Sequence, residues 1–141
     1  PVAKDLRLIT SVLKMITDLE RIGDHAADIS KLTVFMESNR QPFKIKQIQQ
    51  MADESEKMIH MTLKSFINQD HLIADEVIKN DDVVDAYFLD IKGIVVDAIR
   101  HQNIDADDAI YLMMATKYLE RIADHAVNIA EWVKFSIFGE H

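Results

Sequence analysis

The residues most able to do chemistry are acidic side chains that recur every four positions. Glu20, Asp24 and Asp28 follow this spacing. An α-helix turns by about 100° per residue, so residues four apart share a face and these carboxylates form a stripe. Like charges one turn apart repel, and a bound cation would offset that repulsion. Carboxylate oxygens suit magnesium, calcium, manganese or iron, and suit zinc less well without a nitrogen donor.

The acidic stripe belongs to a segment that occurs twice in the chain. Residues 19–30 read LERIGDHAADIS, and residues 119–130 read LERIADHAVNIA, so that eight of the twelve positions are identical. Packing alone would require only the apolar positions to match, yet Glu, Arg, Asp and His repeat in the same order. We interpret the repeat as a duplicated site. Its second copy supplies Glu120 and Asp124, and has Asn128 in place of a third carboxylate.

A further acidic pair, Asp81 and Asp85, shows the same four-residue spacing beside an apolar seam. These two residues could reach a neighbouring acidic stripe, or they could form an ordinary polar helix edge.

Other polar residues of the duplicated segment allow several roles. His25 and His125 follow the central Asp of each copy. They could bind a metal, hydrogen-bond to its ligands, or line a helix interface. Arg21 and Arg121 could pair with Asp18 or with a Glu of their own helix.

Long helices must position these residues, because 141 residues contain only three Gly and two Pro. We predict one helix that ends before residues 38–42. Three further helices are expected to span about 43–68, 70–100 and 105–138. Asp70 and Asp105 are the expected N-caps, and Gly139 is the expected stop. The fold class is all-α, with four long antiparallel helices forming an up-and-down bundle. The seams predicted to face the core are Val12, Met15, Leu19, Ile22, Ala26 and Ile29; Ile45, Ile48, Met51, Met58, Met61 and Ile67; and Val77, Val84, Phe88, Ile91, Val95 and Ala98.

Composition excludes several function classes. The net charge of −8 argues against nucleic acid as a partner. No apolar run approaches the roughly 18–20 residues that span a bilayer. The chain has no Cys and therefore no disulfide or thiolate chemistry. No nucleophile constellation, Gly-rich phosphate loop or basic patch occurs, so neither catalysis nor direct phosphate binding is assigned.

The twin LERIGDHA and LERIADHA segments, the DDVVD stretch at 81–85 and the NIAE ending at 128–131 resemble the duplicated signature of the PhoU family. The resemblance covers essentially the whole chain and implies two three-helix repeats. A single helical domain, 1–141, would then comprise the last helix of the first repeat (1–39) and a complete second repeat (43–141).

The resemblance also implies a function. The expected protein is a metal-binding, non-enzymatic negative regulator in the cytoplasm, at most peripheral to the inner membrane face. It would link phosphate ABC transporter subunits to a sensor histidine kinase. The implied ions are iron, manganese, magnesium or zinc, and the implied metal residues are Glu20, Asp24, Asp28, Asp81, Asp85, Glu120 and Asp124.

Two helices of the usual six would precede residue 1, so the chain corresponds to the C-terminal two-thirds of the family pattern or to a shortened member. The acidic pair of the first site would be missing with them. Without these helices, the first helix must lie on the other three or exchange with another chain. We therefore expect a homo-oligomer formed partly through this helix, because a long exposed apolar seam favours association.

Two alternatives remain. One is a helical interaction module whose acidic faces bind a basic protein. The other is a carboxylate di-metal enzyme, whose bundles use Glu-x-x-His motifs. The five-residue step from Glu20 to His25 places the two about 140° apart, and the stripe faces away from the core, which counts against the enzyme.

Overall fold

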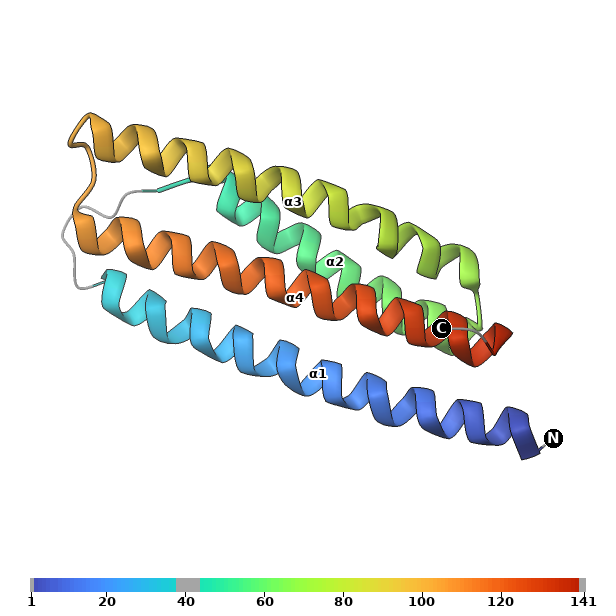
Figure 1. Ribbon diagram of the computed structural model, residues 1–141. Coiled ribbons are helices and arrows are strands. Elements are labelled where there is room, and N and C mark those ends of the chain that lie inside the picture. The colour runs from blue at the N-terminus through green and yellow to red at the C-terminus, as the bar shows by residue number, and fades with distance from the viewer. Residues whose placement is uncertain (1, 38–43, 140–141) are drawn as a thin grey trace.

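The computed structural model describes residues 2–37 and 44–139 and is built from four α-helices. These are α1 (Val2–Glu37), α2 (Lys46–Asn68), α3 (His71–Arg100) and α4 (Ala106–Phe138), shown in Figure 1. The described residues contain no strand. The predicted all-α class is confirmed.

Local chemistry explains where three of the helix ends fall. The Asp70 side chain accepts a hydrogen bond from the Leu72 amide (2.9 Å), and Asp105 accepts one from the Asp107 amide (3.1 Å). Both residues are therefore the N-caps that the sequence predicts. Gly139 adopts a φ of 78° after the last turn of α4, which confirms it as the stop. The predicted break at 38–42 and the expected helix start at 43 lie outside the described residues.

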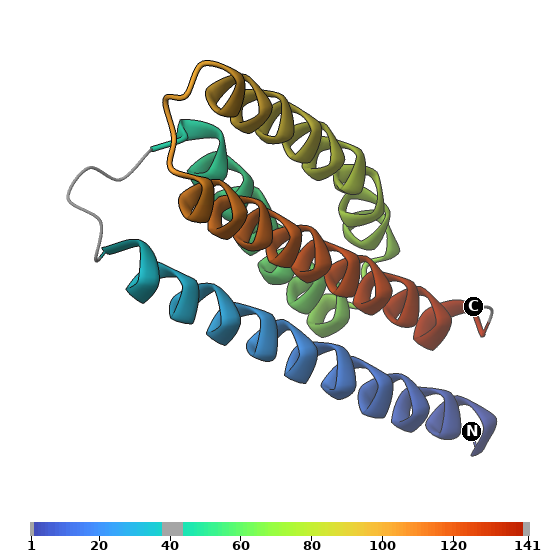
Figure 2. The ribbon, with the colours of Figure 1, turned by 60° about the vertical axis from the view of Figure 1, so that its left-hand side comes forward.

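The helices do not contribute equally to the bundle. Helices α2, α3 and α4 pack against one another, whereas α1 packs against α4 alone among the described helices. Figures 1 and 2 show α1 lying along α4 and running antiparallel to it. The sequence analysis expected the first helix to lie on the other three or to exchange with another chain, and in the structure it lies on α4 and on neither α2 nor α3. Because α2 and α3 already cover each other and two sides of α4, only the remaining side of α4 is available to α1.

The main core lies among α2, α3 and α4. Met51, Met58, Val77, Ile91 and Ile129 are completely buried there. All the predicted seam positions of α3 are buried or partly buried.

Two predicted core residues are instead exposed. Ile67 is 78% exposed, because it follows the buried Ser65 by two residues and therefore points about 200° away from it. Ala26 is exposed because α1 meets a single helix and buries only a narrow stripe that follows Met15 and Ile22.

Ile129 and Ile67 provide a matched test of the core assignment, because one is buried and the other is exposed. Ile129→Ala should lower the free energy of unfolding by about 2–5 kcal/mol, because the side chain leaves a cavity. Ile67→Ala removes the same atoms from an exposed site and should cost less than about 0.5 kcal/mol. Urea denaturation followed by circular dichroism measures both, and equal losses would contradict the assignment.

Candidate metal-binding site

Acidic residues from α3 and α4 lie side by side on the surface. Asp81 and Asp85 are one turn apart on α3, Glu120 and Asp124 are one turn apart on α4, and these two helices pack together. The negative charges of Asp85, Asp124 and Glu120 all act on the Asp81 carboxyl. We call these four residues the α3–α4 acidic cluster. Asp81 and Asp85 thus do reach a neighbouring acidic stripe.

Asp81 has a strongly raised pKa. Loss of surrounding water, followed by the charges of Asp85 and Asp124, raises its pKa from 3.8 to about 6. Its Oδ1 atom is buried and has no hydrogen-bond partner among the described residues. A buried carboxylate oxygen usually accepts a hydrogen bond or binds a cation. Asp81 therefore has the capacity to accept one further ligand.

On the α4 side of the cluster, nearby basic side chains offset part of the negative charge. Loss of water raises the pKa of Asp124, as do the charges of Glu120 and Asp85, while Lys117 and His125 oppose the shift. Lys117 Nζ lies 2.6 Å from Glu120 Oε1. This ion pair neutralises part of the charge at one end of the cluster.

The first copy of the site is built differently. Glu20 and Asp24 are exposed on α1, and Asp28 is partly buried. Since α4 is the one described helix beside α1, no equivalent of α3 brings a second acidic pair to this stripe. The first copy is therefore three carboxylates on a single helix.

The acidic side chains of the cluster are not arranged as a ready-made metal site. Within residues 2–37 and 44–139, no three His, Asp or Glu side chains are arranged so that they could hold one ion together. The cluster nevertheless offers only oxygen donors, which suit a hard cation. Asp85 and Asp124 are exposed, so their carboxylates can change rotamer without disturbing the core. The metal role of the seven acidic residues stays a prediction.

The two histidines of the duplicated segment line the interface between α1 and α4. Their rings are stacked, with centroids 5.6 Å apart. His25 also stacks on Tyr118, and His125 Nδ1 lies 2.9 Å from Asp18 Oδ1. Each histidine therefore meets the residue seven positions before the other histidine, as expected for two helices related by an approximate twofold axis. Burial lowers the pKa of His25, and the charges of His125 and Arg121 lower it further.

Asp18 is the polar residue whose role the sequence analysis did not identify. It is 9% exposed and pairs across the interface with His125. The repeat gave no signal for this pair, because the equivalent of Asp18 in the second copy is Tyr118. Its position one turn before the buried Ile22 could have indicated an inward-facing carboxylate.

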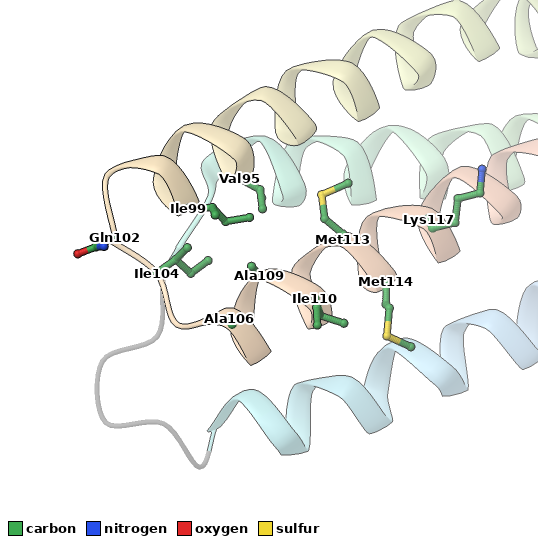
Figure 3. A pocket seen from close by; sticks show the side chains of 10 residues that line it. All are labelled: Val95, Ile99, Gln102, Ile104, Ala106, Ala109, Ile110, Met113, Met114 and Lys117. Atoms are coloured by element: carbon green, nitrogen blue, oxygen red, sulfur yellow. The ribbon is translucent and has the colours of Figure 1, made fainter.

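A separate apolar cavity of about 700 Å³ lies where α3 ends and α4 begins. Figure 3 shows that its lining comes from the end of α3, the connection and the first turns of α4. Val95, Ile99 and Met113 are typical lining residues, and the polar ones are Gln102 and Lys117. With no carboxylate or histidine in its lining, this cavity provides neither metal ligands nor an acid–base pair.

The described residues thus form an all-helical bundle with an acidic cluster at the edge between α3 and α4. The PhoU domain model matches residues 1–33 and 48–133. The chain belongs to the PhoU family. Proteins of this family are regulatory accessory proteins and not enzymes, in agreement with the sequence analysis.

Individual relatives extend the comparison. The phosphate-specific transport system accessory protein PhoU homolog 1 of Thermotoga maritima is 34% identical, over 100% of this chain and 61% of its own length. The corresponding PhoU homolog of Borreliella burgdorferi is 32% identical, over 99% of this chain and 65% of its own. The chain thus spans less than two thirds of the length of these relatives.

Solved structures agree with this assignment. The crystal structure of PhoU from Pseudomonas aeruginosa superposes with a TM-score of 0.92 at 31% identity, over 99% of this chain and 68% of that one. The phosphate transport system regulatory protein PhoU from Streptococcus pneumoniae gives a TM-score of 0.90 at 26% identity. In the described residues, none of the helices is sufficiently long and apolar to span a membrane.

The raised pKa of Asp81 predicts a pH-dependent effect of Asp81→Asn in protein kept metal-free with a chelator. Ionisation of Asp81 is less favourable in the folded than in the unfolded protein, so it lowers the free energy of unfolding. This loss is absent below pH 3.8, grows as the pH rises, and is complete above about pH 6. The substitution should therefore raise the free energy of unfolding by about 1 kcal/mol at pH 8, after allowance for solvent screening, and change it little at pH 4. Urea denaturation at both pH values measures this effect.

Asp90→Asn is the matched control, because Asp90 is exposed on the same helix outside the cluster. A gain from Asp81→Asn that is equal at pH 4 and pH 8, or that Asp90→Asn reproduces, would contradict the electrostatic account.

Proposed function

We propose that this chain is the metal-binding helical part of a regulatory accessory protein of phosphate uptake. Family membership supports the regulatory role, because the named relatives are accessory or regulatory proteins of phosphate transport. The observation that carries the metal proposal is the buried, unpartnered Oδ1 of Asp81 within a cluster of mutually repelling carboxylates.

In this proposal the cation binds to the α3–α4 acidic cluster. A divalent ion would reduce the repulsion that contributes to the raised pKa of Asp81 and Asp124. It would also bind the buried Oδ1 atom of Asp81, which has no hydrogen-bond partner among the described residues. Manganese, magnesium and iron fit the all-oxygen donor set, and zinc fits it less well. The α1 stripe of Glu20, Asp24 and Asp28 would bind more weakly, because a single helix supplies all its carboxylates.

The proposal also includes partners. The protein acts in the cytoplasm as a negative regulator that connects phosphate ABC transporter subunits with a sensor histidine kinase. It is at most peripheral to the membrane, and it self-associates. The names of the relatives support the connection to the transporter, because they describe accessory proteins of phosphate-specific transport.

A second candidate function is a docking surface for a basic protein. The absence of a preformed three-ligand group in the described residues favours this candidate, because exposed carboxylates can also recognise Lys and Arg. The two candidates differ in whether an ion is bound in the absence of any partner.

Metal loading of two double variants separates these candidates. After incubation with Mn²⁺ and gel filtration, the parent should retain manganese by elemental analysis. Glu120→Ala/Asp124→Ala should weaken binding by about tenfold or more, because it removes half the cluster. Glu20→Ala/Asp24→Ala removes the same residue types from α1 and should have a much smaller effect.

Two outcomes would overturn the metal proposal. One is a parent protein that cannot be loaded with Mn²⁺, Fe²⁺ or Zn²⁺. The other is retention of metal by Glu120→Ala/Asp124→Ala equal to that of the parent. Either result would leave the acidic faces as protein-docking surfaces.

A further inference from the structure

The apolar cavity and the α3–α4 acidic cluster lie along one strip of surface. Residues that alternate in steps of four and three share a face of a helix. On α4 one such row runs from the cavity to the cluster: Ile110, Met114, Lys117, Arg121 and Asp124. The matching row on α3 is Asp81, Asp85, Phe88, Lys92, Val95 and Ile99. We call the surface formed by these two rows the α3–α4 strip.

Lys117 joins the two parts of the strip. Its Nζ atom lies 2.6 Å from Glu120 Oε1 in the cluster and 5.4 Å from the centroid of the Phe88 ring on α3. The same side chain lines the cavity. The cavity and the cluster are therefore neighbouring parts of one surface.

The cavity end of the strip exposes bulky apolar side chains to water. Ile99 is 52% exposed, Ile110 is 57% exposed and Met114 is 40% exposed. Together with the cavity of about 700 Å³, they form a hollow apolar surface of the kind that marks a site of interaction. Methionine side chains such as Met113 and Met114 can adapt their shape to a partner.

The exposure of the strip does not depend on further helices packed on α1. The repeat relates α1 to α4 by an approximate twofold axis, and α2 and α3 pack on α4 without packing on α1. Helices placed on α1 in the same way would pack on α1 and not on α4. They would therefore leave the strip uncovered.

The lining of the cavity favours an apolar side chain of a protein over a small molecule. Small-molecule sites hold their ligands with a few precisely placed polar groups. Figure 3 shows the side chain of Gln102 pointing away from the cavity, and Lys117 is paired with Glu120. An amphipathic helix needs no such group, because it binds by laying its apolar face into a hydrophobic groove.

The length of the strip fits a short helix. Fourteen residues separate Ile110 from Asp124, which corresponds to about 21 Å along α4. A partner helix of about four turns would therefore reach both the cavity and the cluster.

The charge of the strip specifies the polar end of this partner. Four carboxylates gather at the cluster, and a Lys or Arg of a partner placed there would reduce their repulsion. Lys92 and Lys117 lie between the cluster and the cavity, so positive charge along the whole partner would be unfavourable. The complementary helix carries basic residues at one end and apolar residues beyond them.

We propose that the α3–α4 strip binds an amphipathic helix of another protein, with bulky apolar side chains in the cavity and Lys or Arg at the acidic cluster. The inference rests on the proposed function in one respect, namely that a regulatory accessory protein contacts other proteins. It requires no bound metal.

Fluorescence anisotropy with labelled synthetic peptides tests the proposal in a buffer that contains a chelator. Two helical peptides of about fourteen residues carry leucines on one face and lysines in either the first or the last turn, so both orientations are covered. One of them should bind at micromolar concentration. Replacing its lysines by glutamates should weaken binding by about tenfold or more, because like charges would then meet at the cluster.

Ile110→Glu separates apolar contact from charge. The added negative charge alone would strengthen binding of the lysine peptide, but loss of the apolar side chain at the cavity should weaken it by about tenfold. Ile67→Glu makes the same change at an exposed position of α2 and should leave the affinity unchanged. Unchanged helical circular dichroism would show that both variants are folded.

A second pair of variants tests the charged end. Glu120→Ala/Asp124→Ala should weaken binding of the lysine peptide, whereas Glu20→Ala/Asp24→Ala removes the same residue types from α1 and should have little effect. Methyl NMR locates the bound peptide independently: the signals of Ile99, Ile110 and Met114 should shift on binding, and that of Ile67 should not.

Three results would overturn the inference. One is a protein that binds neither lysine peptide, as expected if a segment of this chain outside the described residues or a small apolar molecule fills the cavity. The others are equal affinity for the lysine and glutamate peptides and an Ile110→Glu variant that binds as well as the parent. Peptide binding by a protein that cannot be loaded with Mn²⁺ would overturn the metal proposal alone, so the two failures are distinguishable.

Discussion

The structure depends on the ability of α4 to pack against all three other helices at once. Helices can approach closely on several sides only where side chains are small, and Ala123, Ala126 and Ala130 are completely buried on α4. Larger residues at these positions would force α2, α3 or α1 away. Two acidic residues of α4, Glu120 and Asp124, lie close enough to α3 for their charges to act on Asp81.

The packing of α3 against α4 concentrates negative charge at this edge. Carboxylates scattered over a free surface would be separated by water, but Glu120 and Asp124 on the edge of α4 meet Asp81 and Asp85 on the adjacent edge of α3. Packing therefore converts two ordinary i, i+4 pairs into one region of concentrated negative charge. The α1 stripe has the same residue types, but α4 is the one described helix beside it, and no second acidic pair of the described residues faces it.

The period of the apolar residues was sufficient to predict the four helices, and Asp70, Asp105 and Gly139 were sufficient to locate helix ends, because these signals are local. The repeat indicated the acidic stripes for the same reason. The pairing of Asp18 with His125 was not predictable, because the residues are 107 positions apart and the repeat differs at Tyr118. That α4 is the one described helix that packs on α1 was also missed, since an apolar stripe does not specify which helix covers it. Ile67 has the right residue type for the core, but its angle on α2 directs it to solvent.

Anomalous X-ray diffraction from crystals soaked in Mn²⁺ would test the central claim most directly, because it locates the ion without reference to any variant. The account predicts an anomalous peak within coordinating distance of Asp81, with further oxygen ligands from Asp85, Glu120 or Asp124. It also predicts a weaker peak, or none, beside Glu20 and Asp24 on α1. A strong peak on α1 with none between α3 and α4, or no bound ion at saturating Mn²⁺, would contradict it.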